Sequence, residues 1–420
     1  MNVDHSPSFH WCVSLSRPSL QPETRAHIDL LAQSITDWPA LAQQAQEQMI
    51  APLIYQHLHR WPHRPWLSDA NKAFRAVAYP MAVKALQHDA LQKEFIQNHL
   101  QPLAIDFAIV KGTPLAERYY PHPHTRISRD IDIWLSAKDM VKVVRSAQAA
   151  GFLVYPYQRR LNPTAIAIHF KTRQDIILVD SRSILVELDQ RLDKSGQFFC
   201  IDKVLPRCEY QTINDVTIKV LPTTELFIYL CLHHTRHRWS KMIWLADIEA
   251  LQCAPDYDPA AIEATARSMG VWQTVEATLL FAAACRSTDP RTAARQDDRV
   301  LDMLQDCHAI FLGGRAQEVA AYHTRLTPDF PYAWQINDDQ AQRNDRHKYL
   351  KRFIPTLNDY HMVPLPLSLY PLYYLLRPAL ALVRKWQRAR NAKSTTNHHP
   401  RSTGGASAKS PAPLARLWQN

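Results

Sequence analysis

Seven short apolar runs follow one another in the middle of this 420-residue chain, and they constrain its fold more than any other feature. Each run has the length and the content of β-branched and aromatic residues that buried strands favour. We predict strands at 104–110, 131–135, 151–155, 165–170, 175–179, 184–188 and 216–221. A helical pattern at 136–150, with Ser136 as N-cap and Gly151 after its end, separates the second and third runs. Residues 102–221 therefore predict an α/β or α+β core.

Helical patterns occupy both sides of this core. Residues 1–101 and residues 222–328 carry apolar side chains at the spacing of three and four residues that amphipathic helices show. We therefore predict a helical N-terminal region before the core and a helical C-terminal domain after it.

The end of the chain is first apolar and then basic. Residues 329–390 are rich in proline and aromatic residues, and 364–383 is the most apolar window of the chain. Four prolines and Arg377 in that window disfavour a membrane-spanning helix. We expect residues 329–390 to pack on the body of the protein or on a membrane surface.

The net charge of +10 also belongs to the end of the chain. No Asp or Glu follows Asp359, whereas nine Lys or Arg do, so the first 359 residues hold 40 basic and 39 acidic residues. We interpret residues 391–420 as a disordered basic tail with a weak attraction for membrane surfaces or nucleic acid. The cysteines are scattered and form no CxxC pair, so we expect buried, reduced thiols and a cytoplasmic protein. A cytoplasmic protein could still bind to the surface of a membrane.

Two aspartates interrupt the apolar run "DIDIWL". Side chains alternate along a strand, so Asp130 and Asp132 share one face while Ile131 and Ile133 point the other way. Two such carboxylates repel each other and lose hydration, so they require compensating positive charge. Glu187, in a later strand, adds a third carboxylate. We expect the three to bind two Mg²⁺ or Mn²⁺ ions, as phosphoryl transfer requires.

The segment that contains these aspartates resembles a known family. Lys111-Gly112, Leu-Ala, Tyr-Pro, Arg126 and then Asp130-x-Asp132 follow one another as in the bacterial uncharacterised nucleotidyltransferase family, part of the polymerase-β-like nucleotidyltransferase superfamily. The N-terminal helices, the histidine-rich helix pair and the C-terminal apolar stretch also resemble that family, so the likeness extends to about residue 385.

This resemblance implies a fold, an activity and a set of site residues. The fold would be α+β, a polymerase-β-like core of mixed sheet and flanking helices between helical terminal regions. The activity would be transfer of a nucleoside monophosphate from an NTP, with release of pyrophosphate, to an acceptor that could be a small molecule, a sugar, a protein or RNA. The metal ligands would be Asp130, Asp132 and Glu187, and the nucleotide-binding residues Lys111, Gly112, Thr113 and Arg126.

The chain departs from the family pattern at two places. Gly112-Thr113 replaces the Gly-Ser that is usual in the wider superfamily, and a longer insertion precedes Asp130. Asp189 stands where the close family commonly has a histidine. Asp189 shares a face with Glu187, so either could be the third carboxylate. These departures leave open a catalytically silent protein of the same fold that binds a nucleotide or a partner. The C-terminal segment leaves open a membrane-peripheral accessory protein of a surface-polysaccharide or peptide-modification pathway.

Histidines provide further candidates for substrate contact. His234 and His237 lie in one predicted helix and Asp247 in the next. The alternative is a core role, in which Asp247 accepts a hydrogen bond from an imidazole. We also expect His169 in the sheet, next to the catalytic strand, as a candidate general base or phosphate contact.

Overall fold

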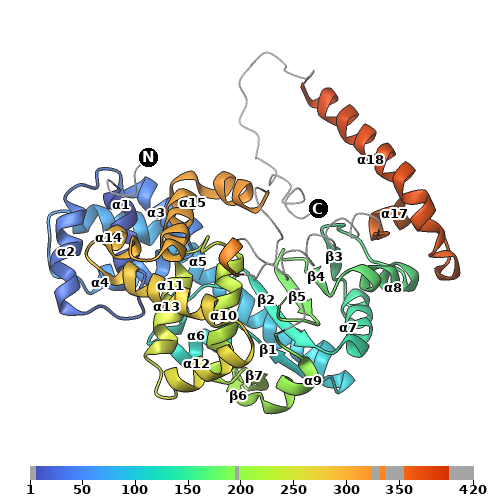
Figure 1. The fold of residues 1–420 in the computed structure, drawn as a ribbon, viewed down its shortest axis with the longest axis horizontal. Helices are drawn as coiled ribbons and strands as arrows, with labels where there is room; N and C mark the ends of the chain where they lie inside the picture. Colours follow the sequence, from blue (N-terminus) through green and yellow to red (C-terminus); the bar gives the residue numbers. More distant parts are fainter. Residues whose placement is uncertain (1–5, 194–197, 324–331, 336–353, 397–420) are drawn as a thin grey trace.

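The computed structural model describes residues 6–193, 198–323, 332–335 and 354–396 (Figure 1). The described residues form a seven-stranded sheet with strand order β3-β4-β5-β2-β1-β7-β6. The strands are β1 (Phe107–Ile109), β2 (Asp130–Leu135), β3 (Leu153–Tyr155), β4 (Asp175–Val179), β5 (Leu185–Asp189), β6 (Glu209–Ile213) and β7 (Val216–Val220). Strand β2 is antiparallel to β1 and parallel to β5, so the predicted mixed sheet is confirmed.

Helices precede, interrupt and follow the sheet strands. Those before the sheet are α1 (Pro7–Leu15), α2 (Pro22–Ala32), α3 (Trp38–Glu47), α4 (Ala51–His59) and α5 (Leu67–Phe95). Those between strands are α6 (Thr113–Tyr119), α7 (Ala137–Ala149), α8 (Pro163–Thr172) and α9 (Ile201–Val204). Those after the sheet are α10 (Thr223–Arg236), α11 (Ile243–Gln252), α12 (Pro259–Ser268), α13 (Trp272–Arg286), α14 (Pro290–Ala294), α15 (Asp298–His323), α17 (Leu357–Met362) and α18 (Leu372–Thr396).

The strand predicted at 165–170 is wrong, because these residues belong to α8. The Asn162 side chain caps this helix by accepting a hydrogen bond from the Ala165 N–H at 2.8 Å. Pro163 in the first turn fixes a helical φ. A run of six apolar residues fits a strand and a buried helix equally well, and here the cap decides between them.

Strand β6 has no counterpart among the predicted strands. It pairs antiparallel with β7 at the edge of the sheet, and only Ile213 of its five residues is buried. Asn214 and Asp215 join the two strands with φ of 48° and 64°. Asn and Asp tolerate this left-handed conformation, which a two-residue hairpin turn requires. An exposed edge strand lacks the apolar alternation that identifies a strand in the sequence.

The two faces of β2 belong to different clusters of buried apolar residues. Ile131, Ile133 and Leu135 pack with residues of α7, α8 and the end of α5. Trp134, on the opposite face, belongs to a cluster with α1, α3, α4, α10, α11 and α13. The N-terminal and C-terminal helices therefore share one core, and that core lies on the face of β2 that carries Asp130 and Asp132.

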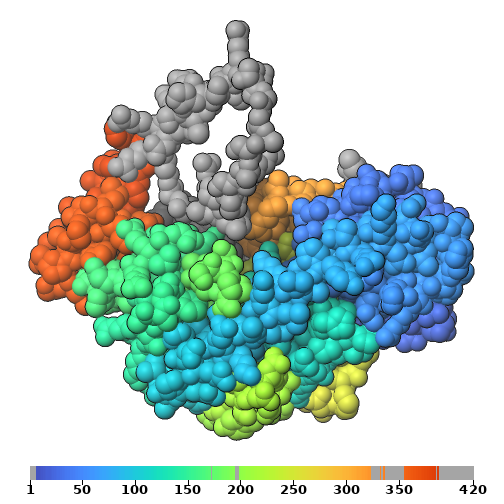
Figure 2. Space-filling model, turned by 180° about the vertical axis from the view of Figure 1, so that it is seen from behind, coloured from blue at the N-terminus to red at the C-terminus, as the bar shows by residue number. Residues whose placement is uncertain are grey.

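Helices α17 and α18 lie at the opposite end of the molecule from the N-terminal helices (Figures 1 and 2). Tyr360 of α17 is hydrogen-bonded to Asn162, which caps α8, at 3.0 Å. Helix α18 continues to Thr396, so residues 391–396 of the predicted disordered tail are helical, and residues 397–420 lie outside the described residues. None of the described helices has the length and apolarity needed to cross a membrane.

The seven cysteines are all free. Five of them are buried, and burial raises the pKa of their thiols. Cys200 and Cys253 are exposed, so the expectation of buried thiols is wrong for these two.

Candidate active site

Three carboxylates meet on one face of the sheet, where β2 and β5 run side by side. Asp132 lies directly opposite Glu187 in the parallel pairing, and Asp130 lies two residues earlier on the same face. Oxygens of the three carboxylates lie within 4.8 Å of one another. Val186 and Leu188, the neighbours of Glu187, are buried in the core on the other face. The strand register thus brings together the three acids that the sequence singles out.

A second group of carboxylates continues this row along β5. Asp189 lies opposite Asp175 of β4, and oxygens of these two and of Glu187 also lie within 4.8 Å of one another. Arg173 donates two hydrogen bonds to Asp175, from Nε at 3.0 Å and from Nη2 at 2.9 Å. Glu187 belongs to both groups, whereas Asp189 lies two residues further along β5, roughly 7 Å farther from Asp130.

Lys111 provides the positive charge that the two aspartates require. Its Nζ lies 2.6 Å from Oδ2 of Asp132 and 3.4 Å from Oδ1 of Asp130. Burial lowers the pKa of Lys111, but the charges of Asp130 and Asp132 raise it by more, so the net shift is upward. The lysine is therefore a protonated counter-ion between the carboxylates.

The two aspartates differ in exposure and in pKa. The Asp132 side chain is 8% exposed, and burial together with the charge of Asp130 raises its pKa to about 7. The Asp130 side chain is 30% exposed, and although burial raises its pKa, Lys111 and Arg129 lower it by more. Near neutral pH the pair thus holds one firmly ionised carboxylate and one that exchanges a proton. Additional positive charge would favour ionisation of both.

Gly112 turns the chain from β1 into α6. Its φ of 81° and ψ of −132° form a backbone conformation that residues with a Cβ rarely adopt. A Cβ at this position would meet Ser128 only at ordinary contact distances of 3.6 and 3.8 Å. The backbone conformation therefore requires glycine here, and lack of space does not. Thr113 begins α6, and its Oγ1 donates a hydrogen bond of 2.6 Å to Asp89 of α5. Helix α5 thereby anchors this turn.

Arg126 lies in a buried ion pair with Asp247 of α11. Its Nε and Nη2 donate to the two carboxylate oxygens of Asp247, both at 2.9 Å. The Tyr120 hydroxyl donates a third hydrogen bond to Asp247 at 2.7 Å. His234 Nε2 is 3.8 Å from the same carboxylate, too far for a hydrogen bond, so the donors to Asp247 are a guanidinium and a phenol rather than an imidazole. This network ties the segment between α6 and β2 to α11.

His234 and His237 have different surroundings. His234 is fully buried and stacks on Trp244, with ring centroids 4.7 Å apart and planes 7° apart. Burial, with smaller contributions from Arg126 and Lys111, lowers the pKa of His234 well below its usual value, so its ring is neutral. His237 is the C-cap of α10 and is hydrogen-bonded to the hydroxyl of Tyr322.

His169 lies on α8, so the predicted position in the sheet is wrong. Its Nε2–H donates a hydrogen bond of 2.8 Å to the backbone carbonyl of Asp175. Burial lowers the pKa of this imidazole. His169 therefore holds the backbone of β4 at the residue that contributes to the second carboxylate group.

Helix α10 contributes two further residues to the site, of which the sequence had singled out His233 but not Tyr229. Tyr229 is buried near Lys111 and Asp132, whose charges act on its pKa, and burial raises that pKa. His233 lies one turn later, with its ring 5.6 Å from that of Tyr229. Burial, then His237, then Lys111, lower the pKa of His233 well below its usual value. The spacing of Tyr229 and His233 by four residues was the available signal for a shared helix face.

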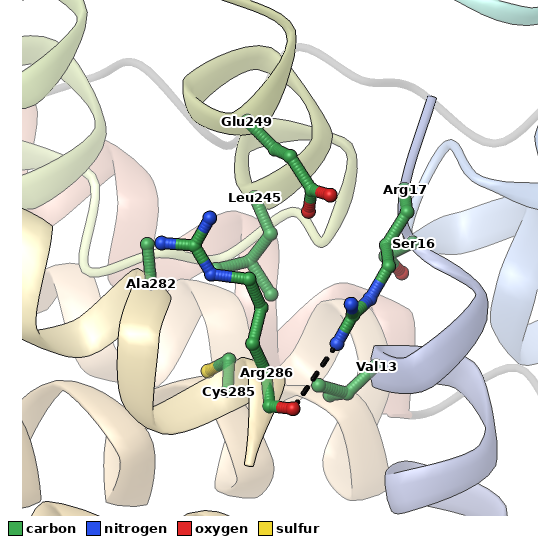
Figure 3. A pocket seen from close by; sticks show the side chains of 8 residues that line it. All are labelled: Val13, Ser16, Arg17, Leu245, Glu249, Ala282, Cys285 and Arg286. Atoms are coloured by element: carbon green, nitrogen blue, oxygen red, sulfur yellow. Dashed lines mark hydrogen bonds between the residues drawn. The ribbon is translucent and has the colours of Figure 1, made fainter. Parts of the chain in front are cut away.

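A small pocket lies elsewhere, among α1, α11 and α13 (Figure 3). It is lined by Val13, Ser16, Arg17, Leu245, Glu249, Ala282, Cys285 and Arg286. Arg17 Nη2 donates a hydrogen bond of 3.3 Å to the backbone carbonyl of Arg286. Burial raises the pKa of Glu249, and the two arginines lower it in part. The pocket lies among helices and includes none of the sheet carboxylates.

The central part of the chain matches a known protein family. A family model described as uncharacterised nucleotidyltransferase matches residues 34–287. The match covers more than half of the chain and includes every strand of the sheet and all five of its clustered carboxylates. No curated protein matches the chain. The chain belongs to the uncharacterised nucleotidyltransferase family.

Proposed function

We propose that this protein is a metal-dependent nucleotidyltransferase, which transfers a nucleoside monophosphate from an NTP to an acceptor. The convergence of Asp130, Asp132 and Glu187, with oxygens within 4.8 Å of one another on one sheet face, is the observation that carries this proposal. Carboxylates held on strands are the oxygen ligands that Mg²⁺ and Mn²⁺ prefer. Membership of the family supports an NTP as the substrate.

The chemistry of the donor set fits divalent cations. Three carboxylates converge on a single ammonium, that of Lys111, so one monovalent cation leaves excess negative charge at the site. Asp130, Asp132 and Glu187 would hold the ions. When bound, such ions neutralise the triphosphate and lower the pKa of the acceptor hydroxyl.

Glu187 is the better candidate for the third ligand. It lies directly opposite Asp132 and belongs to both carboxylate groups. Asp189 lies opposite Trp134 and forms its group with Asp175, whose carboxylate already accepts two hydrogen bonds from Arg173. We infer that Asp189 adds negative charge near the ligands without joining Asp130 and Asp132.

Lys111 would change partner when the substrate binds. With Asp130 and Asp132 engaged by metal ions, the Lys111 ammonium would be available to pair with phosphate oxygens. The turn at Gly112 would bring backbone N–H groups at the start of α6, near Thr113, to the triphosphate.

Arg126 would support the site indirectly, through its ion pair with Asp247. Its guanidinium is engaged by Asp247, so we propose that it positions the segment before β2 and adds positive potential near Asp132.

In the reaction, an acceptor hydroxyl oxygen bonds to the α-phosphorus and releases its proton. The bond from that phosphorus to the bridging oxygen breaks, and pyrophosphate leaves.

A label-transfer assay tests this function. Protein is incubated with Mg²⁺ or Mn²⁺ and each α-labelled NTP, with sugars, small molecules, proteins and RNA as acceptors. We expect transfer by the wild type and only background in the Asp130→Asn, Asp132→Asn double variant. The matched control replaces Asp106 and Asp215, two exposed aspartates of the same core, with Asn.

Two outcomes would count against the proposal. Transfer that survives the change of Asp130 and Asp132 would show that these carboxylates do not hold the catalytic ions. Binding of metal and NTP without transfer to any acceptor would instead favour the catalytically silent protein of the same fold.

A further inference from the structure

One face of α18 is apolar and exposed. Leu375, Leu382 and Trp386 are 79%, 69% and 60% exposed. Three neighbours on the same face are exposed to a lesser degree. We call this face the α18 stripe; its members are Leu372, Leu375, Leu376, Leu382, Val383 and Trp386. The members form two groups, 372–376 and 382–386, which lie on the same face because seven residues, about two helical turns, separate Leu375 from Leu382.

The opposite face of α18 fixes the orientation of the helix. Tyr373 and Leu380 are buried there against the body. Arg377 and Arg384 both form ion pairs with Asp359 of α17, which is fully buried. These contacts prevent the α18 stripe from turning inward, and Figure 1 shows α18 at the outer edge of the molecule.

Positive charge accompanies the stripe. The chain contains no acidic residue after Asp359. Beyond the two paired arginines, the sequence of α18 adds four basic residues, and the segment after it adds three more. These residues are Lys385, Arg388, Arg390, Lys393, Arg401, Lys409 and Arg416. Leu and Trp on one face of a helix with this charge are the features of helices that lie in the interface of an anionic membrane.

The charge also argues against a second copy of the chain as the partner. Two α18 helices packed along their stripes would bring basic residues together without any acidic residue of that segment to compensate them. An anionic lipid surface compensates the same charge. Helix α18 itself contains Arg377, Arg384 and Pro378, and it lacks the continuous apolar length needed to cross a membrane.

We propose that the α18 stripe docks on an anionic membrane surface, with α18 lying in the plane of the headgroups. The proposal does not depend on nucleotidyl transfer, because it rests on the exposed face of α18 and the basic sequence around it.

Vesicle flotation of the full-length protein tests the proposal. We expect flotation with vesicles of phosphatidylcholine and phosphatidylserine, much less with phosphatidylcholine alone, and release by salt. Leu375→Glu with Leu382→Glu should reduce the bound fraction at least tenfold. The matched control introduces the same charges at two exposed leucines elsewhere, Leu30→Glu with Leu86→Glu, and should float like the wild type. Circular dichroism confirms that both variants are folded.

Several results would overturn the proposal. These are a wild type that does not float, equal flotation on both vesicles, and a stripe variant that floats like the wild type. In the last case, loss of flotation in a chain ending at residue 396 would assign binding to the tail instead. Light scattering that finds a wild-type dimer and a monomeric stripe variant, with no flotation of either, would show that a second copy covers the stripe.

Discussion

Replacing Lys111 with methionine removes the ammonium between Asp130 and Asp132 while nearly preserving the length of the side chain. In the absence of metal, the two carboxylates then face each other without this counter-ion. Removing one partner of a buried ion pair costs about 3–5 kcal/mol. Asp130 is partly exposed and Asp132 can take up a proton, so we expect the lower end, about 3 kcal/mol.

This loss converts into a measurable shift of the melting temperature. Unfolding entropy of about 2.1 cal/mol/K per residue amounts to about 0.9 kcal/mol/K for a chain of this size, so 3 kcal/mol lowers Tm by roughly 3 °C. Mg²⁺ or Mn²⁺ at about 100 times its Kd would raise the free energy of unfolding by about 2.7 kcal/mol. The rise with metal should be larger in Lys111→Met than in the wild type, because no lysine competes for the carboxylates.

Thermal melts with EDTA and with Mg²⁺ measure both effects. The matched control is Lys142→Met, which breaks an ion pair of 2.9 Å between Asp139 and a lysine whose side chain is 58% exposed. The lysine is exposed and Asp139 keeps its hydrogen bond of 2.8 Å from Ser136, so the loss should be about 0–1 kcal/mol, and this variant should melt within roughly 1 °C of the wild type under both conditions. If Lys111→Met melts no lower than Lys142→Met, or if metal fails to restore it, the assignment of Lys111 as the counter-ion of a cation site is refuted.

Three further predictions concern the carboxylates and the buried ion pair. With a pKa of about 7, the ionised fraction of Asp132 rises from about a tenth at pH 6 to about nine tenths at pH 8. Mn²⁺ affinity followed by electron paramagnetic resonance should therefore rise roughly tenfold. The raised pKa also means that, without metal, the contribution of Asp132 to stability falls as pH rises from about 4 to 7; both trends should vanish in Asp132→Asn. Glu187→Gln should weaken Mn²⁺ binding at least tenfold more than Asp189→Asn, and equal losses would contradict Glu187 as third ligand. Asp247→Asn leaves the Arg126 guanidinium buried without a charge partner, at a cost of about 3–5 kcal/mol, and a fall in Tm below 2 °C would contradict this role.

The sequence was informative where a local pattern has one structural solution. Asp130 and Asp132 alternate with buried isoleucines, and this alternation alone places both carboxylates on one face of β2. Glu187 alternates with Val186 and Leu188 in the same way. The family resemblance supplied the expectation that these strands adjoin, and the parallel pairing of β2 with β5 agrees with it.

Long-range partners were not predictable from local patterns. Arg126 and Asp247 are 121 residues apart, and nothing near either residue identifies the other as its partner. Lys111 was expected at a phosphate, and its ion pairs with Asp130 and Asp132 depend on how β1 packs beside β2. The helix at 163–172 was missed because apolar runs of that length fit either structure until the Asn162 cap is considered.

Binding of Mn²⁺ together with a non-hydrolysable NTP analogue tests the central claim most directly, because it requires no knowledge of the acceptor. Electron paramagnetic resonance measures the number of bound Mn²⁺ ions in the presence of an analogue of each of the four common NTPs. We predict that at least one analogue increases Mn²⁺ binding to the wild type and that the Asp130→Asn, Asp132→Asn double variant loses this binding. Equal Mn²⁺ binding by the wild type and the double variant would contradict a metal–nucleotide site at these carboxylates.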